Sequence, residues 1–258
     1  MRLLVVPAAG LGSRLGASVP KVLATVNGQS MLSLLVDLYR SWIEGLVVIT
    51  HPSSTSQVTA HLQRLLPNAP VRWWVAEQQS PTGMLDAIME ARQLVASNDP
   101  ETIWITWCDQ VGVLPSTAER LAGAERGCAL TVPTIWRAHP YIHFDRDQRG
   151  RIVRVLHRRE GDTLPDRGES DIGLFALSRE AYLDYLPRYA RETERGQQTR
   201  ERNFLPFIPW LAVRAPVCTL SASDEREAIG INSPEDLRTV EAWLRTPQRA
   251  NEMRSSAS

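Results

Sequence analysis

Lysine is almost absent from this sequence. Lys21 is the only lysine in 258 residues, and every other basic residue is an arginine. An arginine side chain ends in a planar fork, whereas lysine carries a compact ammonium on a thin stem that fits between phosphate oxygens. Apart from chance, a chain that uses arginine everywhere else keeps a lysine only where this small cation is needed. Lys21 is therefore the first candidate functional residue.

Net charge is absent as well. The 29 basic residues balance 29 acidic ones, and the sequence pI is about 7.0. Without a basic field there is no long-range attraction to nucleic acid or to an anionic membrane, so local groups must hold any anionic ligand. No apolar run reaches the ~18 residues of a membrane span, and the first residues lack the length and cleavage site of a signal peptide. We expect a cytoplasmic protein that binds neither nucleic acid nor membranes; its oligomeric state stays open.

Cysteine is scarce, and no CxxC or Cys/His metal spacing occurs. We predict that Cys108, Cys128 and Cys218 are reduced thiols that serve as small apolar residues. The five histidines are too scattered along the chain to form a metal set. Thiol redox chemistry and a histidine metal centre are therefore disfavoured.

Short apolar runs alternate with helical patterns in the first half of the chain. Runs such as 3–7 (LLVVP) and 46–50 (LVVIT) are typical of strands covered on both faces. The alternation with short links predicts right-handed crossovers and a mostly parallel sheet, hence an α/β fold. The expected strands are 3–7, 46–50, 71–75, 102–107 and 129–133.

After residue 134 the pattern indicates antiparallel strands, which we expect at 141–145, 152–156 and 172–177. A helix at 179–189 follows. The arginine-rich loop through Arg202 is expected to be mobile. Ser233, followed by a proline and an aspartate, opens a closing helix.

A glycine-rich loop follows the first expected strand. Gly10, Gly12 and Gly16 allow backbone N–H groups to approach phosphate oxygens, although a plain tight turn has the same composition. The spacing is not the GxGxxG of dinucleotide-binding proteins, and the second strand ends in Thr50 and His51 rather than in an acidic residue. No GK[ST] follows, which excludes a Walker A loop.

Arg14, Pro20 and Lys21 extend this loop to GxGxRxxxxxxPKxL. An arginine fork and a lysine ammonium on one loop can hold a triphosphate. The pattern resembles the signature of the sugar-1-phosphate nucleotidyltransferases, the family of the N-acetylglucosamine-1-phosphate uridylyltransferase domain and the glucose-1-phosphate thymidylyltransferases. The resemblance implies that Arg14 holds the leaving pyrophosphate and that Lys21 holds the α-phosphate and the acceptor phosphate, both as catalytic residues.

Residues 78–83 (QQSPTG) are similar to the segment with which this family reads the nucleobase. An amide such as that of Gln78 offers a donor and an acceptor side by side to a base edge. The resemblance implies a pyrimidine, because the thymidylyl and uridylyl branches of the family use this segment, and cytidylyl transfer stays open. The nucleotide-binding residues that the resemblance implies are Ala8, Ala9, Gly10, Leu11, Gly12, Ser13, Arg14, Lys21, Gln78, Pro81, Thr82 and Gly83.

Asp109 lies just past an expected buried strand, at the sheet edge where open α/β folds bind ligands. It looks like the family's catalytic, metal-binding aspartate. Asn232, in GINSPEDL, resembles the second metal ligand. One carboxylate and one amide suit Mg²⁺, which keeps several waters and takes its other oxygens from phosphates. Without the resemblance, Asp109 reads as a helix cap and Asn232 as a turn residue.

The acceptor site departs from the family pattern. Asp171, in ESDIGLF, falls where relatives place an asparagine that holds the sugar. Relatives also carry an EEK sequence after the preceding strand, whereas this chain has Leu156, His157 and Arg158. The missing carboxylate weakens the case for a standard hexose 1-phosphate, although Arg158 can hold the acceptor phosphate. The implied acceptor-binding residues are Asp109, Arg158, Glu169, Asp171 and Gly173.

These observations predict an α/β, Rossmann-like nucleotide-diphospho-sugar transferase fold, with a mixed, mostly parallel sheet flanked by helices and a smaller antiparallel acceptor-binding section. We expect a single nucleotidyltransferase domain at 1–245, with a nucleotide-binding half at 1–134 and an acceptor-binding half with the closing helix at 135–245. Residues 246–258 lack periodicity and are expected to form a disordered tail. Because the sequence contains no carboxyl-terminal acyltransferase helix domain, a bifunctional enzyme is not expected.

The expected activity is Mg²⁺-dependent transfer of a nucleoside monophosphate from a nucleoside triphosphate to a sugar 1-phosphate or similar phosphorylated acceptor, with release of pyrophosphate. Three alternatives stay open. The first is a glycosyltransferase of the same fold that uses a nucleotide sugar, with DRD at 145–147 as its only candidate metal motif. The second is a non-catalytic nucleotide-sugar sensor. The third, within the family, is a cytidylyltransferase that acts on a non-hexose phosphate or phosphonate.

Overall fold

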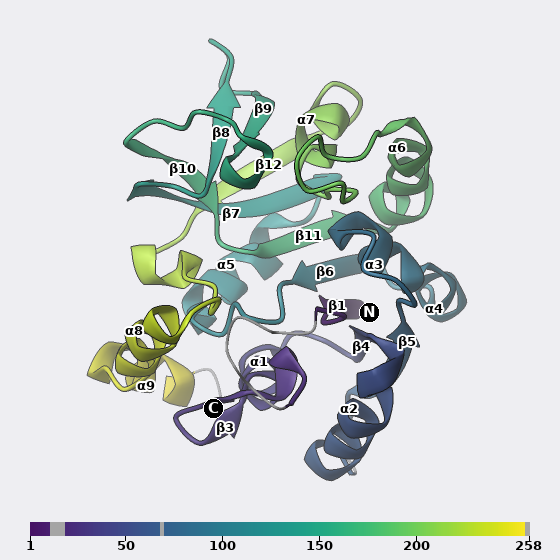
Figure 1. Cartoon of the computed structure of the whole chain (residues 1–258), viewed down its shortest axis with the longest axis vertical. Helices are drawn as coiled ribbons and strands as arrows, with labels where there is room; N and C mark the ends of the chain where they lie inside the picture. Colours follow the sequence, from purple (N-terminus) through teal and green to yellow (C-terminus); the bar gives the residue numbers. More distant parts are fainter. Residues whose placement is uncertain (11–18, 68–69, 256–258) are drawn as a thin grey trace.

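The computed structural model describes residues 1–10, 19–67 and 70–255 (Figure 1). Its centre is an eight-stranded sheet in the order β10-β7-β11-β6-β1-β4-β5, with β12 paired to β7. Strands β10 and β11 run antiparallel to the others, so the sheet is mixed and mostly parallel. The strands are β1 (Arg2–Pro7), β4 (Gly45–Thr50), β5 (Arg72–Glu77), β6 (Thr102–Thr106), β7 (Leu130–Ala138), β10 (Arg167–Asp171), β11 (Leu174–Ser178) and β12 (Val217–Ser221).

Two small ribbons stand outside this sheet. One pairs β2 (Thr25–Val26) with β3 (Gln29–Ser30), and the other is the hairpin of β8 (Ile142–Arg146) and β9 (Ile152–His157). Figure 1 shows the hairpin above β7, in the second half of the chain. The predicted fold class, with its smaller antiparallel section, is confirmed.

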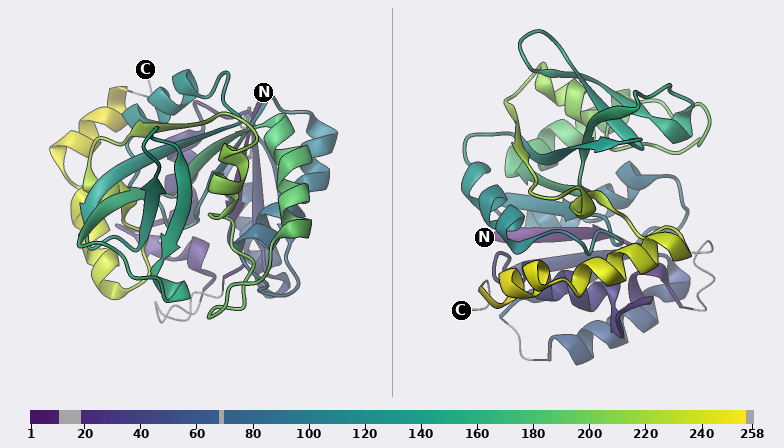
Figure 2. Two further views of the ribbon diagram at one scale, coloured as in Figure 1. Left: turned by 90° about the horizontal axis from the view of Figure 1, so that it is seen from above. Right: turned by 90° about the vertical axis from the view of Figure 1, so that its left-hand side faces the viewer.

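Helices cover both faces of the sheet because its central strands are apolar on both sides. In β1, Leu4 and Val6 face one core while Leu3 and Val5 face the other, and all four side chains are fully buried. Figure 2 (left) shows α8 on one side of the strands and α3 and α6 on the other. The first core includes α1 (Met31–Tyr39), α2 (Pro52–Leu65), α5 (Pro115–Ala124) and α8 (Pro234–Leu244). The second includes α3 (Met84–Glu90), α4 (Arg92–Asn98), α6 (Leu186–Glu192) and α7 (Phe207–Ala212).

The end of the chain differs from the expected disordered tail. Helix α9 (Pro247–Ser255) follows α8 directly, and Glu252 accepts hydrogen bonds from the backbone N–H and the hydroxyl of Ser116. Such a contact is invisible in a sequence without apolar periodicity. In the described part of the chain, no helix is both long and apolar enough to cross a membrane.

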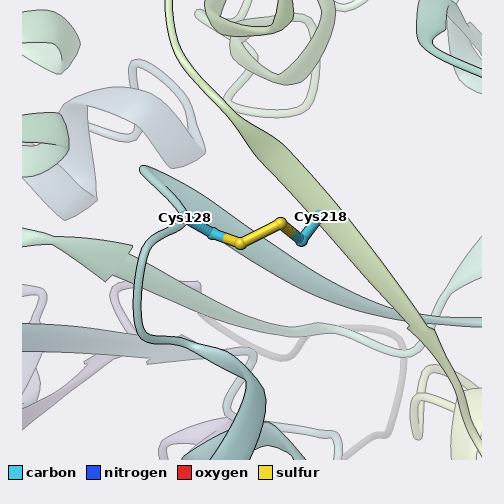
Figure 3. Close-up of a disulfide and its surroundings, with 2 residues drawn as sticks. All are labelled: Cys128 and Cys218. Carbon is cyan, nitrogen blue, oxygen red and sulfur yellow. A yellow bond between two sulfur atoms is a disulfide. The ribbon is translucent and has the colours of Figure 1, made fainter.

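The prediction of three reduced thiols is wrong for two of them. Cys128 and Cys218 form a disulfide (Figure 3) with Cα atoms 6.1 Å apart. The cause lies in the tertiary structure. Strand β12 runs parallel to β7 with Cys218 opposite Thr131, which brings Cys218 close to Cys128, two residues before β7. Only Cys108 is free, and burial raises the pKa of its thiol to about 12.

We predict that reduction of this disulfide destabilises the protein. The bridge joins residues 90 positions apart, and opening a long loop enlarges the conformational freedom of the unfolded chain. We expect the free energy of unfolding to fall by about 2–4 kcal/mol, measured by urea titration with and without reductant. The variant Cys108→Ser should show the same difference. Identical midpoints with and without reductant would contradict the prediction.

Candidate active site

The candidate site lies where the central parallel strands end. Strands β1, β4 and β6 run in the same direction, so Pro7, Thr50 and Thr106 close them at one edge of the sheet. The backbone N–H of Ala8 bonds to Ile49 O at 2.7 Å, which carries the chain across this edge into the glycine-rich loop. Open α/β folds bind their ligands at this carboxyl edge.

Three side chains from distant parts of the chain meet there. The Lys21 ammonium donates to Asp109 Oδ2, and to Asn232 Oδ1 at 2.9 Å. The side chains of Lys21 and Asp109 are 14% and 12% exposed, so the ion pair is largely shielded from water. The structure thus brings the only lysine together with both predicted metal ligands.

Local structure fixes the position of each partner. Lys21 begins the 3-10 helix η2 (Lys21–Leu23), which Pro20 closes by accepting a bond from Leu23 N at 2.8 Å. Asn232 directly precedes the capping box of α8, and its N–H donates to the carboxylate of that box at 3.0 Å. The backbone N–H of Ile231 donates to Asp109 O at 3.2 Å. The residue before Asn232 is therefore hydrogen-bonded to the backbone of Asp109, which holds the two predicted metal ligands close together.

The donor chemistry of this pair fits a magnesium ion. In the described ranges, no group of three or more His, Cys, Asp or Glu residues could hold a metal. Asp109 offers a carboxylate oxygen and Asn232 an amide oxygen. The Lys21 ammonium contacts both, so the two oxygens lie close enough to bind one small cation together. Mg²⁺ commonly binds to one or two protein oxygens and completes its shell with water and phosphate.

The predicted nucleobase segment follows β5 at the same edge. Gln78 is 5% exposed, and its amide Nε2 donates to Gly83 O at 3.1 Å. Gly83 has φ +128°, and a Cβ there would lie 2.4 Å from Arg202 N. The backbone of Arg202 therefore covers the face of Gly83 that a side chain would occupy. Pro81 and Thr82 complete the turn between these residues.

Of the predicted acceptor residues, Gly173 packs against Gln110, the neighbour of Asp109, and Asp171 is hydrogen-bonded to Gly173. Asp171 ends β10 and accepts a hydrogen bond from Gly173 N at 2.8 Å. Burial raises the pKa of the Asp171 carboxyl to about 6, despite this bond. Gly173 has φ +73°, and a Cβ there would lie 2.4 Å from Gln110 Cγ, so only glycine lets the Asp109 loop pack this closely.

The structure places the other predicted acceptor residues differently. Glu169 makes a two-pronged ion pair with Arg146 of β8, with both bonds at 2.7 Å. Arg158 lies in η3 (Arg158–Glu160) and donates to Pro140 O at 3.2 Å. Neither contact joins the Lys21 cluster, and an acceptor role for these residues stays a prediction. Of the nucleotide-binding residues, Leu11, Gly12, Ser13 and Arg14 lie outside the described part of the chain.

Sequence reasoning missed two residues next to the site. Arg202, placed in a mobile loop, donates its backbone N–H to Thr82 O at 2.8 Å and accepts from Leu85 N at 3.0 Å. Glu160 binds the same loop one residue further along, through Asn203 Nδ2 at 2.9 Å. No local pattern signals contacts between such distant positions, because an arginine-rich stretch reads as a solvated surface.

A mostly parallel α/β sheet with an ammonium, a carboxylate and an amide at its carboxyl edge defines the class of nucleotide-binding α/β enzymes. Residues 4–172 match the family model of the MobA-like NTP transferase domain. The match covers more than half of the chain, and the chain belongs to this family. It is a nucleotidyltransferase, and enzymes of this family generally depend on a divalent metal ion.

Curated relatives include the bifunctional protein GlmU of several bacteria. The GlmU of Burkholderia mallei (strain SAVP1) is 27% identical over 246 residues, which are 92% of this chain and 51% of that protein. The GlmU of Aromatoleum aromaticum is 26% identical over 242 residues, which are 92% of this chain and 50% of the relative. The chain thus spans about half the length of the curated relatives it matches.

We predict that Asp171→Asn changes how stability depends on pH. The pKa of about 6 in the folded protein exceeds the ordinary carboxyl value of 3.8, so the fold favours the protonated acid and loses stability as pH rises toward 6. An amide carries no such cost and can still accept from Gly173. The gain in unfolding free energy of the variant over the wild type should be greater at pH 8 than at pH 5 by about 1–2 kcal/mol.

Denaturant titrations at the two pH values measure this difference. The exposed Asp184→Asn supplies the matched control and should show no difference between the two pH values. An equal effect of Asp171→Asn at both pH values would show that the buried carboxyl is not the source.

Proposed function

We propose that the protein transfers a nucleoside monophosphate, with a pyrimidine base, from a nucleoside triphosphate to a sugar 1-phosphate or a similar phosphorylated acceptor. The observation that carries the proposal is the cluster of Lys21, Asp109 and Asn232 at the carboxyl edge of the sheet. Membership of the NTP transferase family supports the reaction class. The GlmU relatives support a sugar phosphate as the acceptor.

In this reaction an oxygen of the acceptor phosphate attacks the α-phosphorus. The bond between the α-phosphorus and the bridging oxygen breaks, and pyrophosphate leaves with the electron pair. The protein supplies positioning and charge rather than a side-chain nucleophile. Without substrate the Lys21 ammonium is paired with Asp109, and with nucleotide bound we propose that it contacts the α-phosphate and the acceptor phosphate.

Asp109 and Asn232 would hold Mg²⁺, which neutralises phosphate charge when bound. Arg14 would hold the leaving pyrophosphate. Gln78 and Gly83 would hold the base, because their amide and backbone lie together beyond β5.

The acceptor half supports an unusual acceptor. Where relatives place the EEK carboxylates, Leu156 is buried and His157 packs its ring against Tyr141 at a centroid distance of 5.3 Å. Burial lowers the pKa of His157 below its ordinary value of 6.5, so the imidazole is neutral at pH 7. A neutral ring replaces a carboxylate there, which favours a non-hexose phosphate or phosphonate as the acceptor over a hexose 1-phosphate; a cytidylyltransferase acting on such an acceptor stays an alternative within the family.

The glycosyltransferase alternative has no support from its metal motif. Asp147 accepts hydrogen bonds from Arg149 N and Arg151 N at 3.0 and 2.9 Å, within its own hairpin turn. Arg146, between the two aspartates of DRD, pairs with Glu169. The DRD sequence therefore stabilises the turn of the β8–β9 hairpin. Membership of a transferase family likewise disfavours a silent sensor.

Two further expectations belong to the proposal. The single-domain organisation, with nucleotide and acceptor halves, is supported by a sheet that takes strands from both halves. A cytoplasmic location also stays a prediction. The disulfide is the observation against it, because thiols in that compartment are kept reduced.

Lys21→Ala should lower the rate of pyrophosphate release by about 10²–10³-fold, because the variant loses the cation that neutralises phosphate charge in the transition state. Lys21→Arg should not restore the rate, since the wider fork does not fit where the ammonium lies. The assay is pyrophosphate release with Mg²⁺ across a matrix of nucleoside triphosphates and phosphorylated acceptors.

The exposed Arg64→Ala on α2 is the matched control and should keep the wild-type rate. Circular dichroism should show that all variants are folded. A Lys21→Ala protein with wild-type turnover would end the assignment.

A further inference from the structure

The connection from α6 to α7 contains a segment that touches both halves of the molecule. We call residues 196–203 the strap. Figure 1 shows this connection, in green, between α6 and α7 on the side of the sheet that carries α3. Arg202 of the strap lies on the nucleobase segment 78–83, whereas Gln198, Thr199 and Asn203 are held by Glu160 of η3, directly after β9.

At the nucleobase end, the strap binds through its backbone. Arg202 donates to Thr82 O at 2.8 Å and accepts from Leu85 N at 3.0 Å, which places one hydrogen bond on each side of Gly83. The Arg202 guanidinium adds an ion pair with Asp86 at 2.7 Å. Gly83 is therefore held from one side by the Gln78 amide and from the other by the strap.

On the side of the acceptor half, the carboxylate of Glu160 binds several residues of the strap. Glu160 accepts hydrogen bonds from Gln198 N at 3.1 Å, from Asn203 Nδ2 at 2.9 Å, and from the hydroxyl and the backbone N–H of Thr199. Burial alone would raise the pKa of Glu160, but these hydrogen bonds outweigh it and lower the pKa to about 2. The carboxylate is thus ionised at neutral pH, where it is the stronger acceptor.

The strap also forms a wall of a pocket in the acceptor half. A pocket of about 440 Å³ lies between β9 and the strap, and His157, Glu160, Gly196 and Asn203 are among its lining residues. His157 occupies part of the stretch that replaces the EEK sequence of relatives. A change in the strap therefore alters both the support of Gly83 and the shape of this pocket.

We propose that the strap couples the nucleobase site to the acceptor site, with Glu160 as the positioning residue. The proposal rests on the proposed function, because it assumes that residues 78–83 hold the base. Arg202 and Asn203 are adjacent, so the contact on Gly83 and the bond to Glu160 are separated by one peptide unit. A base that presses on Gly83 shifts the strap, and by reciprocity an acceptor that fixes the pocket strengthens nucleotide binding.

The test begins with Glu160→Gln, whose amide keeps the shape but brings N–H donors against the strap's own donors. Hydrogen exchange should accelerate by about tenfold or more at the amides of Leu85 and Arg202, which form the contact between the strap and the nucleobase segment. Exchange in the buried strand β4 should not change. The exposed Glu119→Gln, on α5 and away from the strap and its pocket, is the matched control.

The functional readout is nucleotide affinity without acceptor, measured by calorimetry with UTP, CTP and dTTP. Glu160→Gln should weaken binding of the preferred nucleotide about fivefold or more, although residue 160 lies in the acceptor half. In turnover, the KM for nucleotide should rise more than kcat falls. Thr199→Val removes a single donor and serves if Glu160→Gln does not fold; it should shift both readouts in the same direction.

Perturbation from the opposite end provides a second test. Gly83→Ala drives a methyl group into the Arg202 backbone and should accelerate exchange at the Thr199 amide, next to Glu160. Gly127→Ala is its control, because Gly127 has φ +81° but open space around a Cβ. It reproduces the backbone strain without touching the strap.

The outcomes separate the two proposals. If the wild type binds nucleotide and Glu160→Gln binds it equally well, or exchanges equally slowly at Leu85 and Arg202, the coupling proposal is overturned while the proposed function stands. If the wild type binds no nucleoside triphosphate, the proposed function fails first, and the coupling with it.

Discussion

The contact of one ammonium with a carboxylate and an amide oxygen holds the site together. Lys21, Asp109 and Asn232 come from the loop after β1, the loop after β6 and the entry to α8, and the bonds of Lys21 to the other two join these segments. In low-dielectric surroundings, a carboxylate without a partner is costly, so the ammonium stabilises the largely buried Asp109 carboxylate. In the proposed function, the ammonium exchanges Asp109 for phosphate oxygens. Lysine suits this exchange better than arginine because its charge is compact and its stem is thin.

The fold presents this cluster because of strand order and direction. The parallel strands β1, β4 and β6 end at one edge, where backbone loops are free of the ladder and can carry polar side chains. The antiparallel strands β10 and β11 bring Asp171 and Gly173 to the same edge, against Gln110 beside Asp109. Strands from the first and the second half of the chain are thereby joined in one sheet, and the strap 196–203 contacts both halves on the outside.

Two bridges of different kinds support the second half of the chain. The disulfide ties β12 to Cys128, two residues before β7, and the ionised Glu160 ties the strap to η3. Chain entropy opposes both arrangements, because each closes a long loop. The disulfide acts mainly by lowering the conformational entropy of the unfolded chain. The Glu160 carboxylate instead stabilises the folded chain, because it accepts hydrogen bonds from donors of the strap that would otherwise bind water.

Local signals in the sequence predict the α/β class, the buried strands and a functional role for Lys21, because apolar runs, helical periods and a single exceptional residue can be recognised without the fold. The sequence also indicates Asp109 and Asn232, since each follows a pattern that resembles a known family. Tertiary contacts establish what those residues touch and that two of the cysteines are bonded. They also establish that the arginine-rich loop is a strap and that residues 247–255 form a helix. These features arise from segments 38 to 211 positions apart, and no local pattern encodes which distant groups a folded chain brings within bonding distance.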